Sequence, residues 1–557
     1  MKKRNVMRMM ALVMATTLLA GCGKSGENAL FGTQSSRDQQ NGGQTQDGPA
    51  QQKEVTEGTQ GQEADTSSEM AAAEEMDGYY AYDDCEMMIP YESDYQAYGE
   101  EYGEIIENGF LSASRQPFST FSADVDTASY SNVRRMLLDG YELEWIPKDS
   151  VRIEEMINYF DYDYDGPKDK EPFGVNTEIA VCPWNEDNYV MMVGLQTEAV
   201  DFSEAAPSNL VFLIDVSGSM YDEDKLPLLQ QSFAMLASNL TAKDRVSIVT
   251  YAGEDRIVLQ GARGNDTQTI IDALESMEAS GSTNGSAGIE TAYELAEEYF
   301  IDGGNNRVIL ATDGDLNVGL TSEEELECLI SQKKESGVYL SVLGFGTGNI
   351  KDNKMETLAD RGNGNYAYID SLNEARKVLV EEMGATLITV AKDVKLQMEF
   401  NPDVVSEYRL IGYENRALAD EDFTDDTKDA GEIGAGHSVT VLYEIKLVPG
   451  NKSYAAQEWS TLHIRYKEPD EEKSRQLDYR IGAEQLERRP SEDLLFASCV
   501  AQFGMLLRDS EYKGSANYAD VLECLNGLRC VDEDSYKAEF EELVEQAMRL
   551  DSETLYW

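Results

Sequence analysis

The chain has 557 residues, of which 105 are Asp or Glu and 46 are Lys or Arg, so its formal net charge is −59. Its length and its 41% of hydrophobic residues predict roughly two to four domains with real cores. Such an acidic surface repels nucleic acid and anionic lipid headgroups, whereas it suits divalent cations, basic proteins or simple solubility. Only two histidines are present, His437 and His463, which argues against a histidine base or a histidine-rich metal site.

Residues 1–22 predict an export signal that ends in a lipid attachment site. Basic residues come first, a short apolar run follows, and the segment ends in Leu19-Ala20-Gly21-Cys22. The apolar run is shorter than the roughly 20 residues of a membrane-spanning helix and has the length of a secretory signal core. The last four residues resemble the lipobox of bacterial lipoproteins, which implies cleavage before Cys22 and lipidation of its thiol. We expect residues 1–21 to be a signal peptide and the mature chain to be near −63.

A protein of this kind is exported and lies on the extracytoplasmic face of the cell envelope, where disulfides are permitted. We expect the lipid to anchor the chain to the membrane without a spanning segment. Six cysteines follow Cys22, and none of their spacings resembles a zinc site. Cys328 and Cys499 fall on apolar positions of helical patterns, so we expect buried free thiols there. Pairing of Cys524 with Cys530 stays open.

Residues 22–109 are predicted to be an acidic tether that starts at the lipidated cysteine. Residues 23–75 contain almost no large apolar side chain, so they cannot offset the entropy cost of ordering. Residues 76–107 stay acidic and become rich in tyrosine. We interpret this second part as a linker that partly docks on the folded body, with a short ligand-like segment as the alternative.

Residues 110–204 are predicted to combine helices, at 128–138 and 152–160, with strands, at 175–180 and 189–196. Residues 388–485 return to a β-rich pattern, with strands at 394–400, 439–447 and 461–466. Because these two segments flank the middle of the chain, their strands could build one β domain that the middle interrupts. The last segment, 486–557, is predicted to be helical, and Ser491 is placed to cap its first helix.

Residues 205–387 are predicted to fold as a doubly wound, Rossmann-like α/β domain with a mostly parallel sheet. Short all-apolar strands alternate with amphipathic helices, which indicates a buried sheet covered on both faces. The predicted strands are 210–216, 246–251, 257–259, 308–312, 340–345 and 366–369. The predicted helices are about 225–239, 267–277, 287–299, 323–335 and 371–385.

Three loops of this domain carry side chains that can hold a metal. Asp215 stands at the end of a strand, and Ser217 and Ser219 follow it in a tight loop. Thr283 lies in a loop before a helix, and Asp313 ends another strand. In doubly wound sheets ligands lie outside the carboxyl ends of the strands, where these loops can converge. Two carboxylates and three hydroxyls are hard oxygen ligands that suit Mg²⁺, Mn²⁺ or Ca²⁺, and they leave the ion able to accept an acidic group.

The pattern of Asp-x-Ser-x-Ser, a loop threonine and Thr-Asp-Gly resembles the metal-ion-dependent adhesion site of von Willebrand factor type A (VWA) domains. The resemblance implies that the two serines bind the metal directly, that the threonine binds it in ligand-engaged states, and that the aspartates often act through water. Mg²⁺ is the ion we expect, with Mn²⁺ or Ca²⁺ as alternatives. A retained fold with an idle site is the competing interpretation. The residues carried over are Asp215, Ser217, Ser219, Thr283 and Asp313.

The arrangement of the whole chain also resembles the bacterial VWA domain lipoproteins, over nearly all of residues 110–550. Two N-terminal segments carry part of this likeness, STFSADVDTASYSNVRR at 119–135 and VRIEEMINYF at 151–160. Within the first, residues 124–129 superficially resemble a second metal motif. No buried strand precedes them and no partner loops accompany them, so we interpret them as structural.

These features predict a lipid-anchored binding or adhesion module that grips an Asp or Glu of an unidentified protein ligand through the metal. The alternative is a structural or assembly factor of the envelope whose metal only stabilises the fold. We do not expect an enzyme, because the sequence holds no phosphate loop or cofactor fingerprint. A Ser-His-Asp hydrolase is disfavoured because both histidines lie in the β region and not in the strand-end loops of the α/β domain.

Overall fold

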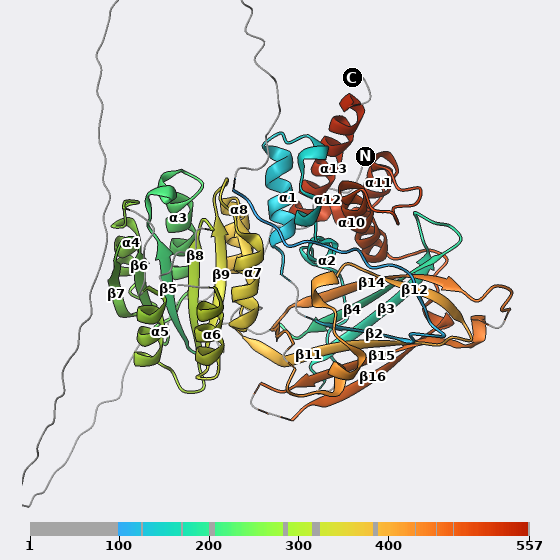
Figure 1. The fold of residues 1–557 in the computed structure, drawn as a ribbon, viewed down its shortest axis with the longest axis horizontal. Coiled ribbons are helices and arrows are strands. Elements are labelled where there is room, and N and C mark those ends of the chain that lie inside the picture. Colours follow the sequence, from blue (N-terminus) through green and yellow to red (C-terminus); the bar gives the residue numbers. More distant parts are fainter. Residues whose placement is uncertain are drawn as a thin grey trace, which may run out of the picture. The chain divides into compact units, whose positions relative to one another are not determined.

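The computed structural model describes residues 99–123, 126–168, 171–199, 206–281, 288–314, 323–382, 388–428, 430–452, 454–469, 471 and 473–554. Within these ranges, no helix has both the length and the hydropathy that a membrane crossing requires. Three layered regions make up the fold: an α/β domain, a pair of β-sheets and a set of helices packed on one of those sheets (Figure 1).

The middle of the chain forms a six-stranded sheet with the order β10-β9-β8-β5-β6-β7. All neighbouring strands run parallel except β7, which pairs antiparallel with β6 at one edge. The sheet is therefore mixed, as the short β6–β7 connection requires. Its strands are β5 (Ser208–Asp215), β6 (Arg245–Tyr251), β7 (Asp255–Arg263), β8 (Asn305–Thr312), β9 (Val338–Phe345) and β10 (Tyr366–Ile369).

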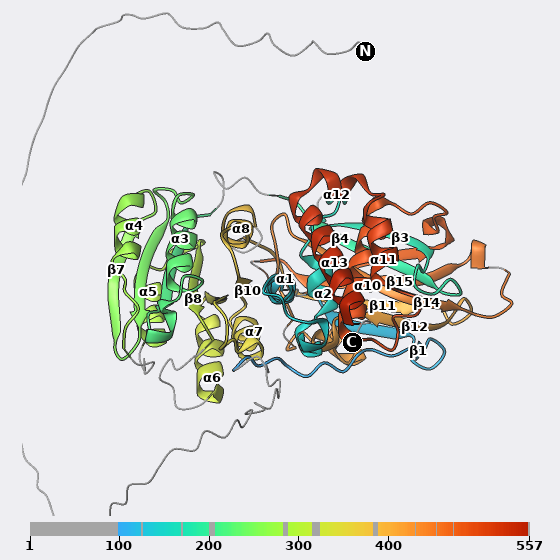
Figure 2. The same cartoon turned by 90° about the horizontal axis from the view of Figure 1, so that it is seen from above.

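Helices cover both faces of this sheet, which confirms the predicted doubly wound domain (Figure 2). Side chains of β5 alternate between two cores, because successive strand residues point to opposite faces. Leu210 and Phe212 pack with α3, α4 and α8, whereas Val211 and Leu213 pack with α5, α6 and α7. The helices are α3 (Leu226–Ala237), α4 (Thr267–Glu275), α5 (Gly288–Glu298), α6 (Glu323–Lys334), α7 (Asp352–Arg361) and α8 (Leu372–Arg376), which continues as a π-helix over Lys377–Glu381.

Strands from both sides of the α/β domain pair with each other. Strand β4, which precedes the domain, lies between β3 and β14, and β14 follows the domain in sequence. The α/β domain is therefore inserted between β4 and β11. One sheet has the order β1-β12-β14-β4-β3, from β1 (Leu111–Ser112), β3 (Phe173–Val181), β4 (Tyr189–Thr197), β12 (Val405–Ile411) and β14 (Ser438–Leu447).

The second sheet lies against the first across a shared apolar core. Its order is β13-β11-β15-β16, and β2 pairs with β11. Strands β12 and β16 were not among the predicted strands, because charged residues stand between their apolar ones: Glu407 and Arg409 in β12, and Asp478 and Arg480 in β16. The members of this sheet are β2 (Phe118–Ser122), β11 (Thr389–Phe400), β13 (Ile433–Gly434), β15 (Glu458–Lys467) and β16 (Arg475–Gly482).

Helices cover the other face of the first sheet, where Cys182, Met192 and Leu442 join the helical core. Ser491 caps helix α10 (Glu492–Arg508) as predicted, because its Oγ accepts a hydrogen bond from Leu494 N–H at 3.1 Å. The helices are α1 (Ala128–Leu138), α2 (Ile153–Asn158), α10 (Glu492–Arg508), α11 (Tyr518–Leu525), α12 (Arg529–Glu533) and α13 (Ser535–Thr554).

The cysteines follow the packing of their helices. Cys499 is buried in α10 as predicted, but the prediction for Cys328 is wrong, because this thiol is exposed on α6. Helix α6 packs through Leu326 and Ile330, and Cys328 lies on the opposite face. Cys524 and Cys530 are both free thiols and are partly buried.

Candidate metal centre

Strand β5 carries Asp215 to the carboxyl edge of the sheet. All eight residues of the strand are buried, and the Asp215 side chain is completely buried. Asp215 Oδ1 accepts a hydrogen bond from Ser217 N–H at 2.8 Å, just before the chain turns into a short 3-10 helix over Gly218–Tyr221. The carboxylate and the turn that follows it are therefore held as one unit.

The two serines of this turn bring their hydroxyls together. Ser217 Oγ and Ser219 Oγ lie 2.9 Å apart. Ser217 is buried, whereas Ser219 is exposed. The hydroxyl pair thus connects the buried Asp215 turn to the surface of the domain.

The loop that carries Thr283 starts against the same turn. Gly218 N–H donates to the Gly281 carbonyl at 3.2 Å, and Ser280 N–H donates to the Val216 carbonyl at 2.8 Å. Thr283 itself lies outside the described residues, so its place in the site stays a prediction.

Asp313 follows β8, the strand beside β5, and is also buried. Thr312 links the two strand ends, because its Oγ1 donates to Asp215 Oδ2 at 3.4 Å and accepts from Gly314 N–H at 3.2 Å. Gly314 has φ +109°, and a Cβ there would stand 2.2 Å from the Asn349 carbonyl, so only glycine fits. The conformation of this turn therefore holds Asp313 at the same edge as Asp215.

Burial sets the electrostatics of the carboxylate pair. Loss of water contact is the main reason that the pKa of Asp215 rises to about 6. The nearby charge of Asp313 contributes to the rise, while hydrogen bonds from Ser217 and Thr312 oppose it. The site is thus costly to keep fully ionised without a cation. Such a cost is typical of carboxylates that a metal ion would compensate.

The structure supplies a compensating cation that sequence reasoning missed. Lys225 Nζ lies 3.0 Å from Asp313 Oδ2, and both side chains are buried, at 7% and 0% exposure. Lys225 immediately precedes α3 and comes six residues after Ser219. The one sequence signal for this contact was the position of Lys225, which follows the acidic run at 222–224 and directly precedes an apolar helical pattern.

The residues present fit a divalent cation. Asp313 Oδ1 is buried and has no hydrogen-bond partner among the described residues. An unpaired buried carboxylate oxygen next to a second carboxylate and two hydroxyls is a hard donor set of the kind that Mg²⁺ or Mn²⁺ takes. No group of three or more His, Cys, Asp or Glu side chains in the described ranges could hold a metal, so any ion here would need the serine hydroxyls as well as the two carboxylates.

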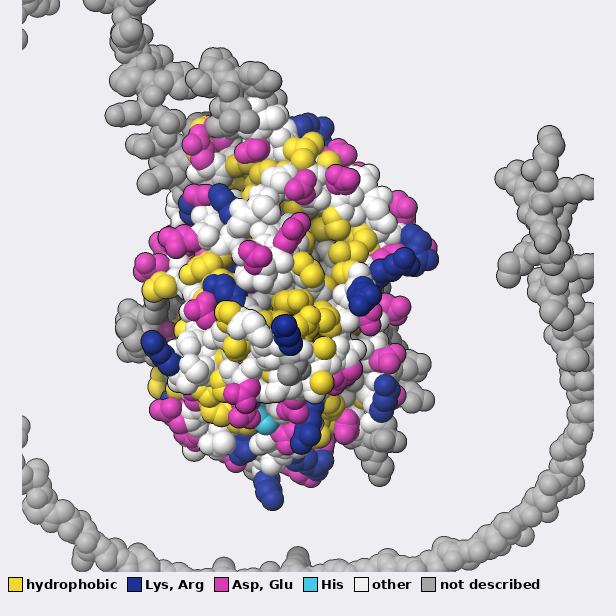
Figure 3. Space-filling view, turned by 90° about the vertical axis from the view of Figure 1, so that its right-hand side faces the viewer, with side chains coloured by type: hydrophobic (Ala, Val, Ile, Leu, Met, Phe, Trp, Pro, Cys, Tyr) yellow, Lys and Arg dark blue, Asp and Glu magenta, His cyan; other side chains and the backbone are white. Residues whose placement is uncertain are grey.

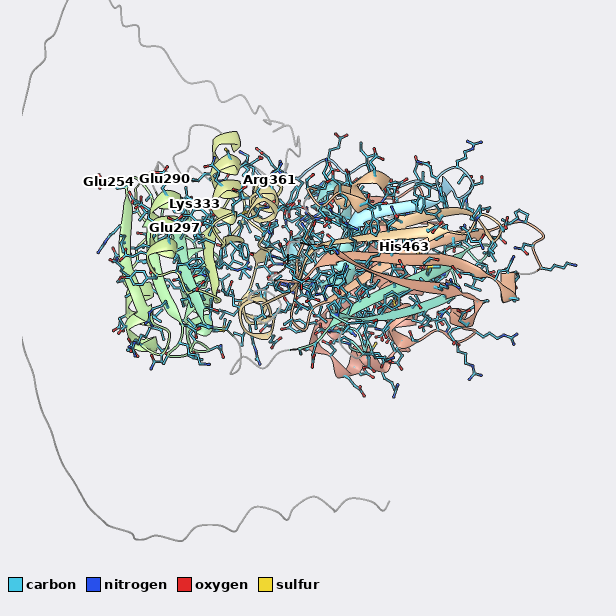
Figure 4. The ribbon with its side chains drawn as sticks, turned by 90° about the horizontal axis from the view of Figure 1, so that it is seen from below. Glu254, Glu290, Glu297, Lys333, Arg361 and His463 are labelled. Carbon is cyan, nitrogen blue, oxygen red and sulfur yellow. The ribbon has the colours of Figure 1, made fainter. Side chains whose placement is uncertain are left out.

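The two histidines lie on other elements. His463 is on β15, where its Nδ1 lies 2.6 Å from Asp478 Oδ1 (Figure 4). His437 stands just before β14, where burial lowers its pKa. Neither belongs to the elements that carry Ser217 and Ser219.

Comparison with known proteins gives the family. A model of the von Willebrand factor type A domain matches residues 209–381, and a model described as von Willebrand factor matches residues 96–192. A model of the C-terminal region of the uncharacterized protein YfbK matches residues 385–550. The chain is 43% identical to the uncharacterized protein YfbK of Escherichia coli (strain K12) over 469 residues, which cover 80% of each chain. The chain belongs to the YfbK family of VWA domain proteins.

Other VWA proteins share less of this chain. The human inter-alpha-trypsin inhibitor heavy chain H3 is 24% identical over 274 residues, which are 45% of this chain and 30% of that protein. Among solved structures, the von Willebrand factor type A protein from Catenulispora acidiphila is 16% identical, with a TM-score of 0.40, over 71% of this chain and 89% of that one. The likeness of this YfbK-family chain to its E. coli relative thus extends well beyond the VWA domain.

Proposed function

We propose that this VWA protein is a binding module that grips an acidic side chain of a partner protein through a divalent metal. Asp215, Ser217, Ser219 and Asp313 would hold the ion, with Thr283 as the fifth residue. The observation that carries this proposal is the buried Asp313 Oδ1, which has no hydrogen-bond partner among the described residues, beside a second buried carboxylate and a pair of hydroxyls. Mg²⁺ is the ion we propose, with Mn²⁺ or Ca²⁺ as substitutes.

Some residues of the proposed site are buried and others are exposed. Asp215 and Asp313 supply buried negative charge, and the hydroxyl of Ser219 reaches the exposed end of the site. When bound, the ion would supply a positive charge to which a carboxylate from outside can bind. Tyr221, which follows Ser219 by two residues in the same short 3-10 helix and is 79% exposed, offers the kind of large aromatic side chain that is enriched at protein interfaces.

Charge supports a protein ligand over a nucleic acid. The chain is −59 overall, and the face drawn in Figure 3, which is on the side of the β-sheets and not of the VWA domain, shows Asp and Glu side chains spread among Lys, Arg and apolar ones, with no continuous basic stripe. Phosphate-rich ligands need such a stripe. A partner that presents Asp or Glu would instead bind through the metal.

The proposal includes anchoring at the cell envelope. The Leu-Ala-Gly-Cys sequence at 19–22 supports lipidation of Cys22 after export. A lipid would keep the binding site on the extracytoplasmic face of the membrane and would limit its partners to molecules that meet that surface.

Metal binding can be tested by stability measurements on the full-length protein. Titration with Mg²⁺ should raise the free energy of unfolding as the logarithm of one plus the ion concentration over Kd, by about 2.7 kcal/mol at a hundred times Kd. Ser219→Ala should lose most of this gain, because it removes a hydroxyl from the exposed end of the site. Ser276→Ala, which changes an exposed serine on α4's C-terminal cap, is the matched control and should behave like the unmodified protein.

The result also separates this proposal from a purely structural role. If all three proteins gain the same stability, the ion binds diffusely to an acidic surface and the proposed site is wrong. If the gain depends on Ser219 but Asp215→Ala leaves the biological phenotype unchanged in a folded protein, the ion only stabilises the fold.

A further inference from the structure

Lys225 is a buried cation inside the proposed metal site. Its ammonium group lies 3.0 Å from Asp313 Oδ2, while the other oxygen of that carboxylate has no partner among the described residues. The lysine therefore occupies one oxygen of Asp313 and leaves the second available. A solvent-exposed lysine could break such a contact easily, whereas the Lys225 side chain is only 7% exposed.

Gly346 leaves the space that the Lys225 side chain occupies. Gly346, just after β9, has φ +74°, and a Cβ at this position would stand 2.3 to 2.8 Å from Cγ, Cδ and Cε of Lys225. The missing side chain of Gly346 thus makes the space in which the lysine lies. The Gly346 carbonyl is itself fixed, because it accepts a hydrogen bond from Tyr368 Oη at 2.8 Å. The lysine is held by the ends of α3, β8 and β9 together.

The lysine changes the charge of the site in a defined way. Asp215 and Asp313 carry two negative charges when ionised, and Lys225 cancels one of them, so these three side chains together carry −1. A divalent ion would turn this into +1, whereas without the lysine the loaded site would be neutral. A positive loaded site needs an anion to balance it, because an uncompensated charge in a buried setting is unfavourable.

We propose that Lys225 is a positioning residue that weakens the site for the ion alone and strengthens it for an acidic ligand. The inference rests on the proposed function and deepens it, because it makes ion binding and carboxylate binding depend on each other. Lys225 would oppose the charge of the ion, would hold Asp313 through Oδ2 so that Oδ1 stays free for the ion, and would leave a net positive charge for the partner's Asp or Glu. By linkage, a carboxylate must then raise the affinity for the ion by the same factor as the ion raises the affinity for the carboxylate.

The test is Lys225→Met in the full-length protein, with Mn²⁺ binding measured by calorimetry. Removal of a like charge beside the ion should lower Kd for Mn²⁺ about tenfold or more. Replacing chloride by acetate at constant ionic strength should tighten Mn²⁺ binding in the unmodified protein and should have much less effect in the variant. In EDTA the variant should melt at a lower temperature, and Mn²⁺ should restore more of its stability than it adds to the unmodified protein.

Lys243→Met is the control for overall charge, because Lys243 is exposed and its replacement removes the same charge away from the site. It should leave Kd for Mn²⁺ unchanged within about twofold. If Lys225→Met does not fold, Lys225→Gln keeps a hydrogen-bond donor without the charge and should show the same tightening.

The outcomes separate the two proposals. A Kd that is unchanged or weaker in Lys225→Met, while Ser219→Ala abolishes binding, overturns the role of Lys225 and leaves the metal site standing. Mn²⁺ binding to the unmodified protein that is insensitive to Ser219→Ala overturns both. If Lys243→Met also lowers Kd for Mn²⁺ about tenfold, the effect comes from the net charge of the protein, and the positioning role of Lys225 is contradicted.

Discussion

Burial decides how the Asp215 carboxylate behaves. The strand that carries it is buried over its whole length, so the carboxylate lies in an environment that disfavours its negative charge. The group stays there because the turn to Ser217 and the Thr312 hydroxyl donate hydrogen bonds to it. The protein thus accepts an electrostatic cost at one residue, as is common at functional sites, and this agrees with the proposed binding of a cation there.

This cost predicts a dependence of stability on pH in the metal-free protein. The pKa of Asp215 is raised to about 6 in the folded state from the ordinary value of 3.8. The folded state therefore binds the Asp215 proton more tightly than the unfolded state does, and this difference stabilises the fold. The stabilisation is complete below about pH 4 and is lost as the pH rises through 6, where the folded state releases the proton. A pKa difference of one between the two states corresponds to about 1.4 kcal/mol, so the loss is about 3 kcal/mol.

Asp215→Asn isolates this contribution, because the amide does not ionise. In EDTA, the free energy of unfolding of Asp215→Asn relative to the unmodified protein should rise by about 3 kcal/mol between pH 4 and pH 7.5, as followed by urea unfolding. Asp302→Asn, which removes one carboxylate at an exposed position outside the site, is the matched control for the loss of charge. A constant difference at all pH values for Asp215→Asn would show that its carboxyl does not titrate in this range.

At the scale of the elements, helix α1 gives the segment at 119–135 a structural role without any metal. Tyr366 N–H on β10 donates to Asp126 Oδ1 at 2.8 Å, and Ser131 Oγ donates to the Tyr368 carbonyl at 2.8 Å. These contacts dock α1 on the edge strand of the VWA sheet. Asp126 also pairs with Arg416, at 3.2 Å, so the described part of this motif is structural, while Asp124 and Val125 lie outside the described residues.

Arg134 is the main ionic contact of this docking. Its guanidinium pairs with Asp370 at 2.5 Å and with Glu374 at 2.7 Å, at the start of α8, and is 2% exposed. Arg134→Met would remove the guanidinium that two buried carboxylates share and should lower the free energy of unfolding by about 3–5 kcal/mol. Arg376→Met breaks only an exposed pair with Glu381 on the same helix and should cost less than about 1 kcal/mol. Thermal unfolding of both variants checks this, and equal losses would contradict a special role for α1.

The elements show which signals the sequence contains. The strands β5 and β8 are predictable because each contains an unbroken apolar run, and β9 because only Ser341 and Gly344 interrupt its apolar residues. The helices around them are predictable because their apolar residues recur at helical spacing. Helix α7 was not predicted, although Met355 and Leu358 carry the same spacing, because most of its other residues are polar. The helix predicted at about 371–385 is present as α8 and the π-helix that continues it, but the helical spacing of the sequence did not predict its change to a π-helix.

At the scale of the whole molecule, the order of the strands in sequence does not indicate which strands pair. Strands β4 and β14 are neighbours in one sheet although about 240 residues separate them, and the VWA domain lies between them in sequence. Periodicity is local and can indicate that both are strands, but it cannot indicate their pairing. The same limit hid Lys225, since its contact with Asp313 joins residues 88 positions apart. What the motif did predict is the convergence of the β5 and β8 ends, because parallel strands end at the same edge of a sheet.

The last prediction concerns the attachment of the whole protein. If Cys22 carries a lipid, Cys22→Ala should move the protein from the membrane fraction to the soluble fraction of lysed cells, because a chain held by a lipid alone has no other strong hold on the bilayer. Cys85→Ala changes another cysteine of the N-terminal segment and should leave the protein in the membrane fraction. The membrane-bound protein should also incorporate a labelled fatty acid, and the Cys22 variant should not. Retention of Cys22→Ala in the membrane fraction, without label, would mean that a different part of the chain or a partner holds it there, and the envelope proposal would then need that partner in place of the lipid.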